Sequence, residues 1–286
     1  MKLSGLNALV TGGSQGFGRH IVEAFLTEGA NVLFCARTKV DVAQAGAELA
    51  VRFPGGPKLK GVVADIADPA SVSALFAAAA SFLGPLDIVV NNAGIYGPIG
   101  PTEEIPWEEW LQTVNVNLSG TLLVSRAAIR AMKPRGYGKI VVISGGGATN
   151  PMPRFAAYAA TKAAVVRLTE TLAEELREFH IDVNAVAPGA LQTRLLKQVL
   201  AAGPEKAGKE FYAKNQKWAE QGAADPRVGA ALCVFLASRE SDGITGKLIS
   251  AQWDPWRDFP QRRDQMRNDI YTLRRIVPED RGQKWS

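Results

Sequence analysis

Short apolar runs alternate with longer segments of helical periodicity along most of this chain, and this alternation constrains the fold more than any other feature. The first run, Leu6–Thr11, precedes a segment in which Ile21, Phe25 and Leu26 recur at helical spacing. Strands that alternate with helices pair in parallel through right-handed crossovers, which place helices on both faces of the sheet. The sequence therefore predicts an α/β fold built on one doubly wound parallel sheet.

Predicted strands and helices account for most of the chain. We expect strands at Leu6–Thr11, Ala30–Ala36, Leu59–Ala64, Leu86–Val90, Lys139–Ser144, Ile181–Ala187 and Lys247–Ala251. We expect helices at His20–Glu28, Val40–Phe53, Pro69–Phe82, Asn115–Met132, Tyr158–Phe179 and Asp225–Ser238. A chain of 286 residues that is 47% hydrophobic can bury one large core. We therefore predict a single domain over residues 1–254 and an extension over residues 255–286.

Charge and hydropathy argue against two classes of partner. The formal net charge is +5, of which Pro255–Ser286 carries +3, from eight Lys and Arg against five Asp and Glu. No run of Lys and Arg with interleaved aromatic residues suggests a nucleic-acid surface. No apolar stretch approaches the roughly 18 residues of a membrane span. We therefore expect neither a nucleic-acid nor a membrane partner.

The few cysteines and histidines indicate neither a disulfide framework nor a metal centre. Cys35 and Cys233 lie far apart in apolar segments, and the two histidines are His20 and His180. The first residues lead straight into a glycine motif and do not resemble a signal peptide. We therefore expect a cytoplasmic protein without a bound metal.

The segment TGGSQGFG, residues 11–18, joins the first predicted strand to the first helix. Glycines allow a close approach of the backbone to a pyrophosphate, and a helix N-terminus presents unpaired N–H groups and partial positive charge to it. The spacing of Gly12, Gly16 and Gly18 differs from the G-x-G-x-x-G fingerprint. The segment indicates a nucleotide site, with an ordinary glycine-rich turn as the alternative.

The end of the second predicted strand bears on which nucleotide is bound. Ala36, Arg37 and Thr38 stand where dinucleotide folds commonly place a carboxylate on the adenosine ribose hydroxyls. An arginine fork suits a phosphate dianion, which a carboxylate would repel. We therefore predict NADP(H) in preference to NAD(H). The alternative is that Arg37 is a surface residue, since Gln15 adds no second cation to the glycine turn.

Polar residues follow the third and fourth predicted strands. Asp65 could accept a hydrogen bond from the adenine amino group, or it could cap the helix that begins near Pro69. Asn91–Gly94 forms a polar turn at the carboxyl end of the fourth strand, where open α/β sheets bind ligands. Asn115 and Asn117 stand in a helical segment, which disfavours asparagine unless its amide is employed.

Tyr158 and Lys162 lie four residues apart in a predicted helix, so their side chains share one helix face. A free tyrosine ionises near pH ~10, and acid/base work near neutrality requires a pKa shift of roughly three units, or about 4 kcal/mol. A unit charge about 4 Å away supplies on the order of 4 kcal/mol at an effective dielectric of about 20. The pair predicts a proton donor whose pKa is lowered by the lysine. A solvated pair on an exposed face is the alternative.

Taken in order, these segments resemble the short-chain dehydrogenase/reductase family over roughly Met1–Ser250. The matching pieces are TGGSQGFG at residues 11–18, Asp65, Asn91–Gly94, Asn117, Ser144, Tyr158, Lys162, Pro188, Gly189 and Thr193. The resemblance implies a single Rossmann-like domain whose seven strands lie in the order 3-2-1-4-5-6-7. It also implies hydride transfer between NADP(H) and a ketone or secondary alcohol, in a homodimer or homotetramer.

The resemblance assigns catalytic roles to four residues. Tyr158 would protonate the carbonyl oxygen, and Lys162 would lower the pKa of Tyr158 and hold the nicotinamide ribose. Ser144 would donate a hydrogen bond to the substrate oxygen, and Asn117 would position a water that links Lys162 to solvent. The family's serine usually precedes the tyrosine by thirteen residues, whereas Ser144 precedes it by fourteen and position 145 is glycine. Thr149 is the alternative hydroxyl.

The resemblance also implies a set of cofactor contacts that starts at the pyrophosphate and ends at the nicotinamide. Its members are Gly12, Ser14, Gly16, Phe17, Gly18, Arg37, Thr38, Asp65, Ile66, Asn91, Ala93, Gly94, Tyr158, Lys162, Pro188, Gly189 and Thr193.

Two further segments bear on the substrate. Residues 191–224 would form a lid, whose five lysines are either solvated or part of a pocket wall for an anionic substrate. Three of the six tryptophans, Trp253, Trp256 and Trp285, lie in the last 34 residues. Because disordered tails are poor in aromatic residues, we expect an ordered extension that packs over the cleft or on a neighbouring subunit.

These features favour a polar or anionic carbonyl substrate, such as a sugar, a polyol or an acyl ketone. The alternative function is that of a catalytically silent NADP-binding sensor or scaffold with the same fold.

Overall fold

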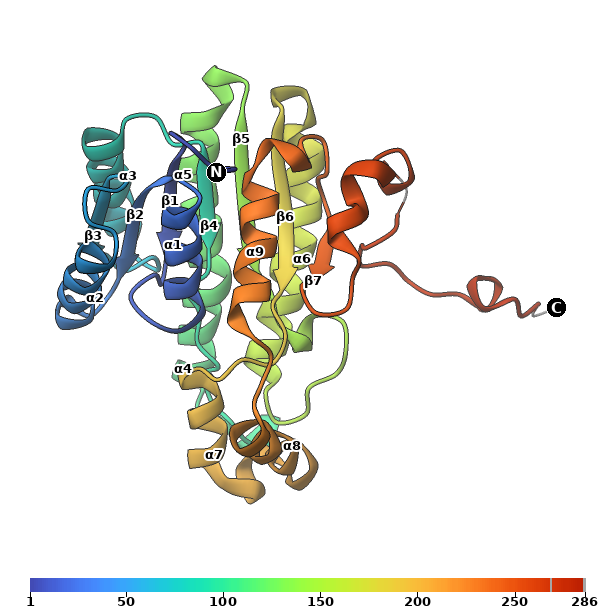
Figure 1. Cartoon of the computed structure of the whole chain (residues 1–286). Coiled ribbons are helices and arrows are strands. Elements are labelled where there is room, and N and C mark those ends of the chain that lie inside the picture. The colour runs from blue at the N-terminus through green and yellow to red at the C-terminus, as the bar shows by residue number, and fades with distance from the viewer. Residues whose placement is uncertain (268, 285–286) are drawn as a thin grey trace.

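Seven parallel strands form one sheet in the order β3-β2-β1-β4-β5-β6-β7 in the computed structural model, which describes residues 1–267 and 269–284 (Figure 1). The strands are β1 (Asn7–Thr11), β2 (Asn31–Ala36), β3 (Leu59–Val63), β4 (Ile88–Asn91), β5 (Gly138–Ile143), β6 (Ile181–Ala187) and β7 (Leu248–Ser250). The predicted fold class and strand order are confirmed. Each strand begins and ends within two residues of its predicted range.

The order of the strands reverses between β1 and β4. β1 pairs in parallel with β2 on one side and with β4 on the other, so that Val10 lies beside both Phe34 and Val90. The chain therefore winds outward in opposite directions from these two strands. Open α/β sheets bind ligands outside the carboxyl ends of strands at such a point.

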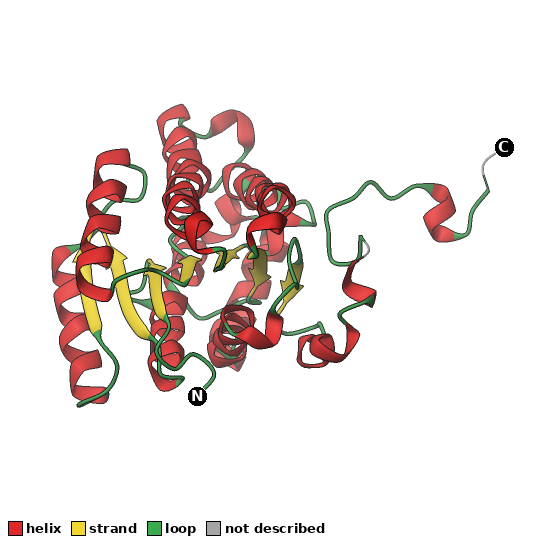
Figure 2. Ribbon diagram, turned by 90° about the horizontal axis from the view of Figure 1, so that it is seen from above, coloured by secondary structure: helices red, strands yellow, loops and turns green. Residues whose placement is uncertain are grey.

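Helices cover both faces of the sheet, as the views from the side and from above show (Figure 1, Figure 2). Their packing divides the hydrophobic core into two layers. One layer contains α1 (Gly16–Thr27), α2 (Lys39–Arg52) and α9 (Pro226–Ala237), and the other contains α3 (Pro69–Leu83), α5 (Gly120–Met132) and α6 (Ala156–Leu176). Strands buried on both faces need nearly continuous apolar sequence, which explains the runs seen in the sequence.

The helix after β3 is capped by a residue that sequence reasoning did not select. The carboxylate of Asp68 accepts hydrogen bonds from two backbone N–H groups in the first turn of α3, at 3.0 and 3.1 Å. Asp65 instead accepts from the backbone N–H of Ala67 at 2.9 Å, in the turn between β3 and α3. The suggestion that Asp65 caps this helix is therefore wrong, because its carboxylate is already used before the helix begins.

The helical segment around Asn117 contains a wider turn. α4 (Trp107–Val114) leads into a π-helical turn, η2 (Asn115–Ser119), which continues into α5. Turns of this kind rotate the side chains that follow them and are frequent at functional sites. The two asparagines thus stand in a distorted turn rather than in a regular helix.

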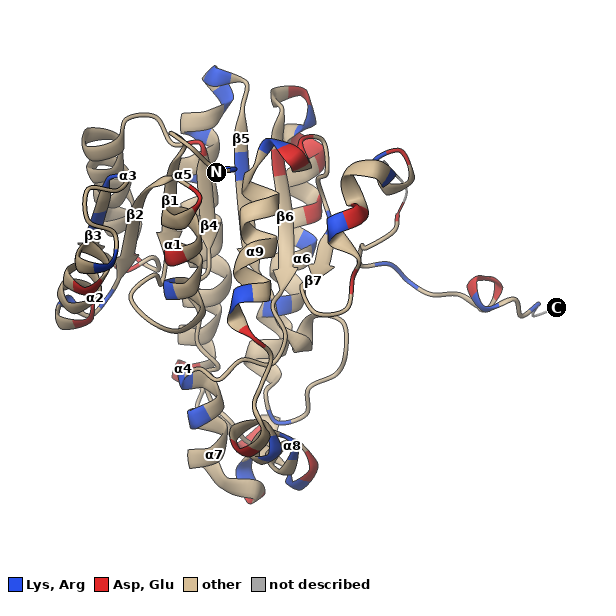
Figure 3. Cartoon of the chain, in the orientation of Figure 1, with Lys and Arg blue, Asp and Glu red and all other residues tan. Residues whose placement is uncertain are grey.

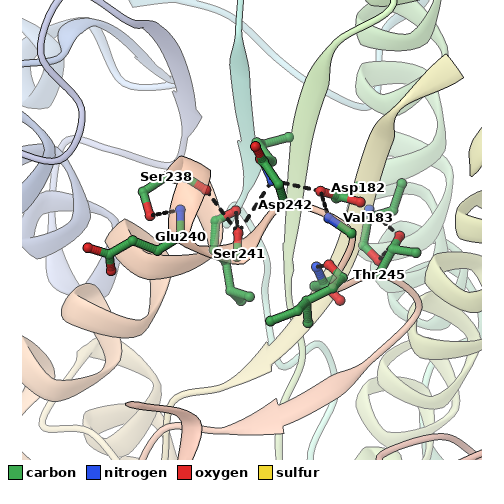
Figure 4. A network of polar contacts seen from close by, with 12 residues as sticks. Asp182, Val183, Ser238, Glu240, Ser241, Asp242 and Thr245 are labelled. Atoms are coloured by element: carbon green, nitrogen blue, oxygen red, sulfur yellow. Dashed lines mark hydrogen bonds and ion pairs between the residues drawn. The ribbon is translucent and has the colours of Figure 1, made fainter. Parts of the chain in front are cut away.

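An ion-pair network around the buried Lys139 joins the amino ends of β5 and β6 to the turn after α9, at the opposite end of the sheet from the carboxyl ends. Lys139 Nζ lies 2.6 Å from a carboxylate oxygen of Asp182 and 2.7 Å from one of Asp242. Lys139 also donates to the hydroxyl of Ser241 at 3.4 Å. Figure 4 shows Asp182, Ser241 and Asp242 close together. Since a buried charge is stable only when it is paired, this network is a structural feature of the core.

The predicted lid consists of α7 (Arg194–Ala207) and α8 (Lys209–Gln221), which lie beyond the carboxyl ends of the strands (Figure 1). Within α7 the helix breaks at Gly203, whose φ is +76°, and Pro204 follows. The lid carries both basic and acidic residues (Figure 3). Its five lysines are all exposed, and they are Lys197, Lys206, Lys209, Lys214 and Lys217. Their exposure agrees with solvated lysines, and a part in the wall of an anion pocket stays a prediction.

The first part of the extension packs on the edge of its own sheet. The short helix η7 (Trp256–Arg262) buries Trp256 and Phe259 in the same core layer as α1 and α9. The backbone N–H of Leu248 in β7 donates to the carbonyl of Tyr271 at 2.8 Å, so the extension covers the edge strand. This arrangement differs from packing over the cleft, because β7 lies at the far edge of the sheet.

The remaining extension contains η8 (Gln265–Arg267) and η9 (Pro278–Arg281), and its last segment projects away from the body (Figure 1, Figure 2). Ile276 in this segment is 59% exposed. Trp285, on which part of the expectation of order rested, lies outside the described residues. Packing on a neighbouring subunit stays a prediction.

Candidate active site

A groove of about 210 Å³ lies over the carboxyl ends of the first four strands. Its walls come from the glycine turn, the ends of β2 and β3, the turn after β4 and the start of the lid. The predicted cofactor residues that line it are Gly12, Ser14, Gly16, Phe17, Gly18, Arg37, Thr38, Asp65, Ile66, Ala93, Gly94 and Thr193. The fold thus brings segments far apart in the sequence to the switch point of the sheet.

The glycine turn is held in a shape that side chains would disrupt. Gly12 has a φ of +66°, in the left-handed region that favours glycine. A Cβ at Gly18 would lie 2.1 Å from the carbonyl oxygen of Gly12, well inside contact distance. α1 begins at Gly16, so its first N–H groups adjoin the groove. The spacing of these glycines differs from the usual fingerprint, but the turn has the same physical properties.

The asparagine that organises this turn is Asn92 rather than Asn91. Asn92 Nδ2 donates to the carbonyl oxygens of Thr11 and Gly12 at 2.9 and 3.1 Å. The side chain of Asn91 points to the other side, where its Nδ2 donates to the hydroxyl of Ser125 at 3.1 Å. Asn91 does not line the groove, whereas Asn92 does. Alternation along β4 was the signal in the sequence that could have separated the two residues.

The end of the groove beside β2 carries both signs of charge. Arg37 and Thr38 are exposed and line the groove, and Arg37 has no ion pair among the described residues. Asp41, from the first turn of α2, lines the same groove. Sequence reasoning missed this carboxylate because it considered only the residues directly after β2.

Tyr158 and Lys162 are both buried, 7% and 6% exposed, in the first turns of α6. Lys162 Nζ lies 5.6 Å from the centre of the Tyr158 ring and donates to the carbonyl oxygen of Ile143 at 2.7 Å. Burial lowers the pKa of Lys162 to about 8. Burial, with a smaller contribution from Tyr96, raises the pKa of Tyr158 well above its ordinary value.

The predicted lowering of the pKa of Tyr158 by Lys162 is therefore not found in the protein by itself. Loss of hydration disfavours the phenolate, and the same loss disfavours the ammonium that would stabilise it. The pair is nevertheless buried together, which excludes the solvated pair considered from the sequence. A low pKa at Tyr158 would need a further positive charge beside the phenol.

Asn117 uses its amide to connect the groove to α6. Its Oδ1 accepts from the backbone N–H of Ile95 at 2.9 Å, and its Nδ2 donates to the carbonyl of Ile95 and to the hydroxyl of Thr161, at 2.9 and 3.1 Å. A Cβ at Gly94 would lie 3.2 Å from Asn117 Oδ1 and 3.6 Å from Lys162 Nζ, so both side chains adjoin this turn. Asn117 thus holds in place the turn at Gly94 and Ile95, which lies between the groove and Lys162.

Ser144 and Gly145 follow β5 and face different neighbours. The Ser144 hydroxyl donates to the carbonyl oxygen of Lys162 at 3.5 Å, and the residue is 3% exposed. No hydrogen bond joins the hydroxyls of Ser144 and Tyr158 among the described residues. A Cβ at Gly145 would lie 2.4 Å from the hydroxyl oxygen of Tyr158. The residue directly beside the Tyr158 hydroxyl is therefore Gly145.

Aromatic side chains enclose the other side of Tyr158. The ring centre of Tyr96 lies 4.6 Å from that of Tyr158 and 5.3 Å from that of Phe155. Phe155 in turn lies 4.9 Å from Phe211 of the lid. The apolar cluster around Tyr158 is completed by Ile99, Met152, Val199, Ala207 and Tyr212. The lid therefore closes over Tyr158 through apolar contacts.

The residues after β6 lead from the sheet into the lid. Thr193 lies against the glycine turn, because a Cβ at Gly16 would be 3.6 Å from its methyl group. Pro188 and Gly189 do not line the groove, and the carbonyl of Pro188 accepts from the side chain of Gln252 at 3.3 Å. Gly189 has a φ of +94°, which turns the chain from β6 toward the lid.

The described residues lack the features of two other kinds of site. None of their helices is long and apolar enough to cross a membrane. They contain no group of three or more His, Cys, Asp or Glu side chains arranged to hold a metal ion. Cys35 and Cys233 are both buried and free.

Comparisons with known proteins agree with this geometry. A family model described as short chain dehydrogenase matches residues 6–203. A short-chain type dehydrogenase/reductase of Picea abies is 36% identical over 252 residues, which cover 86% of this chain and 91% of that protein. Gluconate 5-dehydrogenase of Gluconobacter oxydans (strain 621H) is 34% identical over 249 residues, covering 86% and 93%. The crystal structure of levodione reductase matches with a TM-score of 0.80 and 28% identity, covering 87% and 96%.

Proposed function

Because the chain belongs to the short-chain dehydrogenase family, we propose that it transfers a hydride between NADP(H) and a ketone or secondary alcohol, with Tyr158 as the acid/base. Like its relatives, it is an oxidoreductase that acts on an alcohol or a ketone with a nicotinamide cofactor. The observation that carries the proposal is the buried pair of Tyr158 and Lys162, of which Lys162 adjoins Gly94 in the groove wall. Titratable groups whose pKa is shifted by burial, as in this pair, cluster at functional sites.

The groove has the features that a dinucleotide requires. Gly12, Gly16 and Gly18 place no side chain between the backbone of the turn and the groove, and the N-terminus of α1 faces the same space. Asn92 holds the turn in this shape through two carbonyl groups. The site therefore fits the pyrophosphate of a nicotinamide dinucleotide.

The preference for NADP(H) rests on Arg37. Its guanidinium is exposed in the groove wall without an ion pair among the described residues, so it is available to a 2′-phosphate. Asp41 in the same wall acts in the opposite sense, because its carboxylate repels a phosphate and suits ribose hydroxyls. We favour NADP(H) because Arg37 directly follows β2, where the adenosine ribose of a dinucleotide fold lies.

Tyr158 moves the proton in this mechanism. In reduction its hydroxyl donates the proton to the carbonyl oxygen, and in oxidation it accepts the proton of the alcohol. The bound cofactor supplies or accepts the hydride and, when oxidised, brings a fixed positive charge. Lys162, whose Nζ lies 5.6 Å from the centre of the Tyr158 ring, would stabilise the phenolate and hold the ribose hydroxyls of the bound cofactor. Asn117 keeps the turn at Gly94 in place and leads the proton path from Lys162 toward solvent.

Two substrate classes have support. The name of gluconate 5-dehydrogenase, a relative at 34% identity, favours a polyol or sugar acid, in line with the expectation of a polar or anionic carbonyl compound. The aromatic side chains of Tyr96, Phe155 and Phe211 around Tyr158 favour an apolar ketone. The exposed lid lysines support neither class.

The acid/base role of Tyr158 is tested by Tyr158→Phe. We expect at least about a hundredfold loss of kcat, since a positioned acid/base contributes about 10²–10⁴-fold, together with nearly unchanged NADPH affinity by fluorescence titration. Tyr137→Phe is the matched control, because its hydroxyl is also buried but lies beside the ion-pair network at the other end of the sheet. A Tyr158→Phe enzyme that kept full turnover would refute the role.

The substrate classes are separated by one panel. Polyols and sugar acids are offered with NADP⁺ and NAD⁺, and apolar cyclic and aromatic ketones with NADPH and NADH, and absorbance of the reduced nicotinamide is followed. Turnover confined to polyols would remove the apolar class, and turnover confined to apolar ketones would remove the polyols. A protein that bound NADPH and oxidised none of it on the whole panel would contradict the proposed activity.

Three further expectations stay predictions. Preference for NADP(H) favours the direction of reduction in a cell. The family resemblance favours a homodimer or homotetramer. The composition favours a cytoplasmic location.

A further inference from the structure

The chain has no side chain at the point where the Tyr158 hydroxyl meets the end of β5. A Cβ at Gly145 would lie 2.4 Å from the hydroxyl oxygen of Tyr158, 3.2 Å from Cζ and 3.5 Å from Cε1. Carbon atoms of real side chains do not approach an oxygen to 2.4 Å, so any other residue at 145 would push the phenol away. Gly145 is also the residue thirteen positions before Tyr158, which is where the resembling family usually has its serine.

Ser144 contacts β6 and the backbone of α6 rather than the Tyr158 hydroxyl. Its backbone N–H donates to the carbonyl of Val186 at 2.8 Å, as part of the pairing of β5 with β6. Its hydroxyl faces the carbonyl of Lys162, one helical turn beyond Tyr158. Successive residues at the end of a strand point to opposite sides, so Ser144 and Gly145 cannot both face the Tyr158 hydroxyl.

We propose that Gly145 is the positioning residue for Tyr158, that the active site works without a serine hydroxyl beside the phenol, and that Ser144 serves as a packing contact under Lys162. The inference rests on the proposed acid/base role of Tyr158. Tyr158 is then the hydroxyl that binds the substrate oxygen, and no hydroxyl at the end of β5 assists it. The orientation of the substrate then depends on the apolar cluster around Tyr158 and on the cofactor.

The position of the Tyr158 hydroxyl is tested by stability, without any need for turnover. Gly145→Ala should lower the midpoint of thermal unfolding by about 5 °C, because it overpacks a buried contact. In a Tyr158→Phe background the same substitution should cost much less, since the atom at 2.4 Å is then absent. Gly146→Ala is the matched control, because a Cβ there meets nothing within 4 Å. Equal midpoints for the two alanine variants, or a cost unchanged by Tyr158→Phe, would overturn the proposal.

Turnover tests the part played by Ser144. Ser144→Ala should keep kcat within about threefold, whereas removal of a hydroxyl that stabilises the reacting oxygen costs about 10²–10³-fold. Gly145→Ala should lower kcat about a hundredfold with an unchanged KM for NADPH, because a shift of the acid by about 1 Å has that effect. A hundredfold loss in Ser144→Ala, with normal unfolding and NADPH binding, would overturn the proposal. If the unaltered protein turned over no carbonyl compound, the proposed activity would fail, and the stability comparison would still decide the place of Gly145.

Discussion

Replacing Phe259 by alanine should destabilise the whole domain, although this residue lies in the extension. Phe259 is 1% exposed and belongs to the core layer that contains α1 and α9. Its ring centre lies 5.3 Å from that of Tyr271, whose carbonyl accepts from the β7 residue Leu248. Loss of this ring would therefore open a cavity at the edge of the sheet and loosen the segment that covers β7.

The size of the effect follows from the buried area. A phenylalanine side chain buries about 150–250 Å². At about 25 cal/mol per Å², removing it loses about 4–6 kcal/mol of hydrophobic stabilisation, of which the alanine methyl group keeps a small part. Measured Phe→Ala changes in cores cost about 3–5 kcal/mol. We expect a loss of about 4 kcal/mol for Phe259→Ala, or a fall of about 8–16 °C in the melting temperature at about 2–4 °C per kcal/mol.

Urea unfolding followed by circular dichroism is the assay, with activity as a second probe. Trp253→Ala is the matched control, because this aromatic residue of the neighbouring loop is 85% exposed and its loss should change the free energy of unfolding by under about 0.5 kcal/mol. If Phe259→Ala and Trp253→Ala unfolded at the same midpoint, the extension would not be part of the cooperative core. Deletion of residues 257–286 would then also be tolerated.

The remaining predictions concern charge. Lys162→Met should raise the free energy of unfolding at pH 7 by about 1–3 kcal/mol, because burial lowers the pKa of Lys162 to about 8 and the folded protein resists its protonation. Between pH 8 and 10.5, the ordinary pKa of lysine, Lys162 binds more protons in the unfolded state than in the folded state, so the unaltered protein gains stability as pH rises. The difference in unfolding free energy between Lys162→Met and the unaltered protein should therefore shrink over this range, and a difference independent of pH would contradict this. Lys139→Ala should cost about 3–5 kcal/mol by leaving the buried carboxylate of Asp182 without its cation. Lys2→Ala, which removes an exposed ion pair, should cost under about 1 kcal/mol, and equal costs in chemical unfolding would disprove the distinction. Replacing Ala36 by Asp and Arg37 by Ile should turn the preference toward NADH, and unchanged NADPH affinity in a fluorescence titration would show that Arg37 does not bind the phosphate.

Local sequence determined the elements of this fold and the neighbourhood of its site. The apolar runs fix strands that are buried on both faces. The glycine turn, Asn91–Gly94 and the Tyr158–Lys162 pair, taken in their order along the chain, gave the resemblance to the family. The sequence was less reliable where a role had to be assigned to one of two neighbouring residues. Asp68 rather than Asp65 caps α3, and Asn92 rather than the predicted Asn91 lines the groove.

Tertiary structure decided what depends on contact between distant segments. Only the packing of α6 against the end of β5 shows that Gly145 faces the Tyr158 hydroxyl and that Ser144 does not. Only burial shows that the pKa of Tyr158 rises in the protein by itself, since hydration is a property of the whole surroundings. The place of the extension on β7 likewise depends on which edge of the sheet is open. Residue type and spacing set the chemistry available to this chain, and the folded contacts determine which of those groups meet.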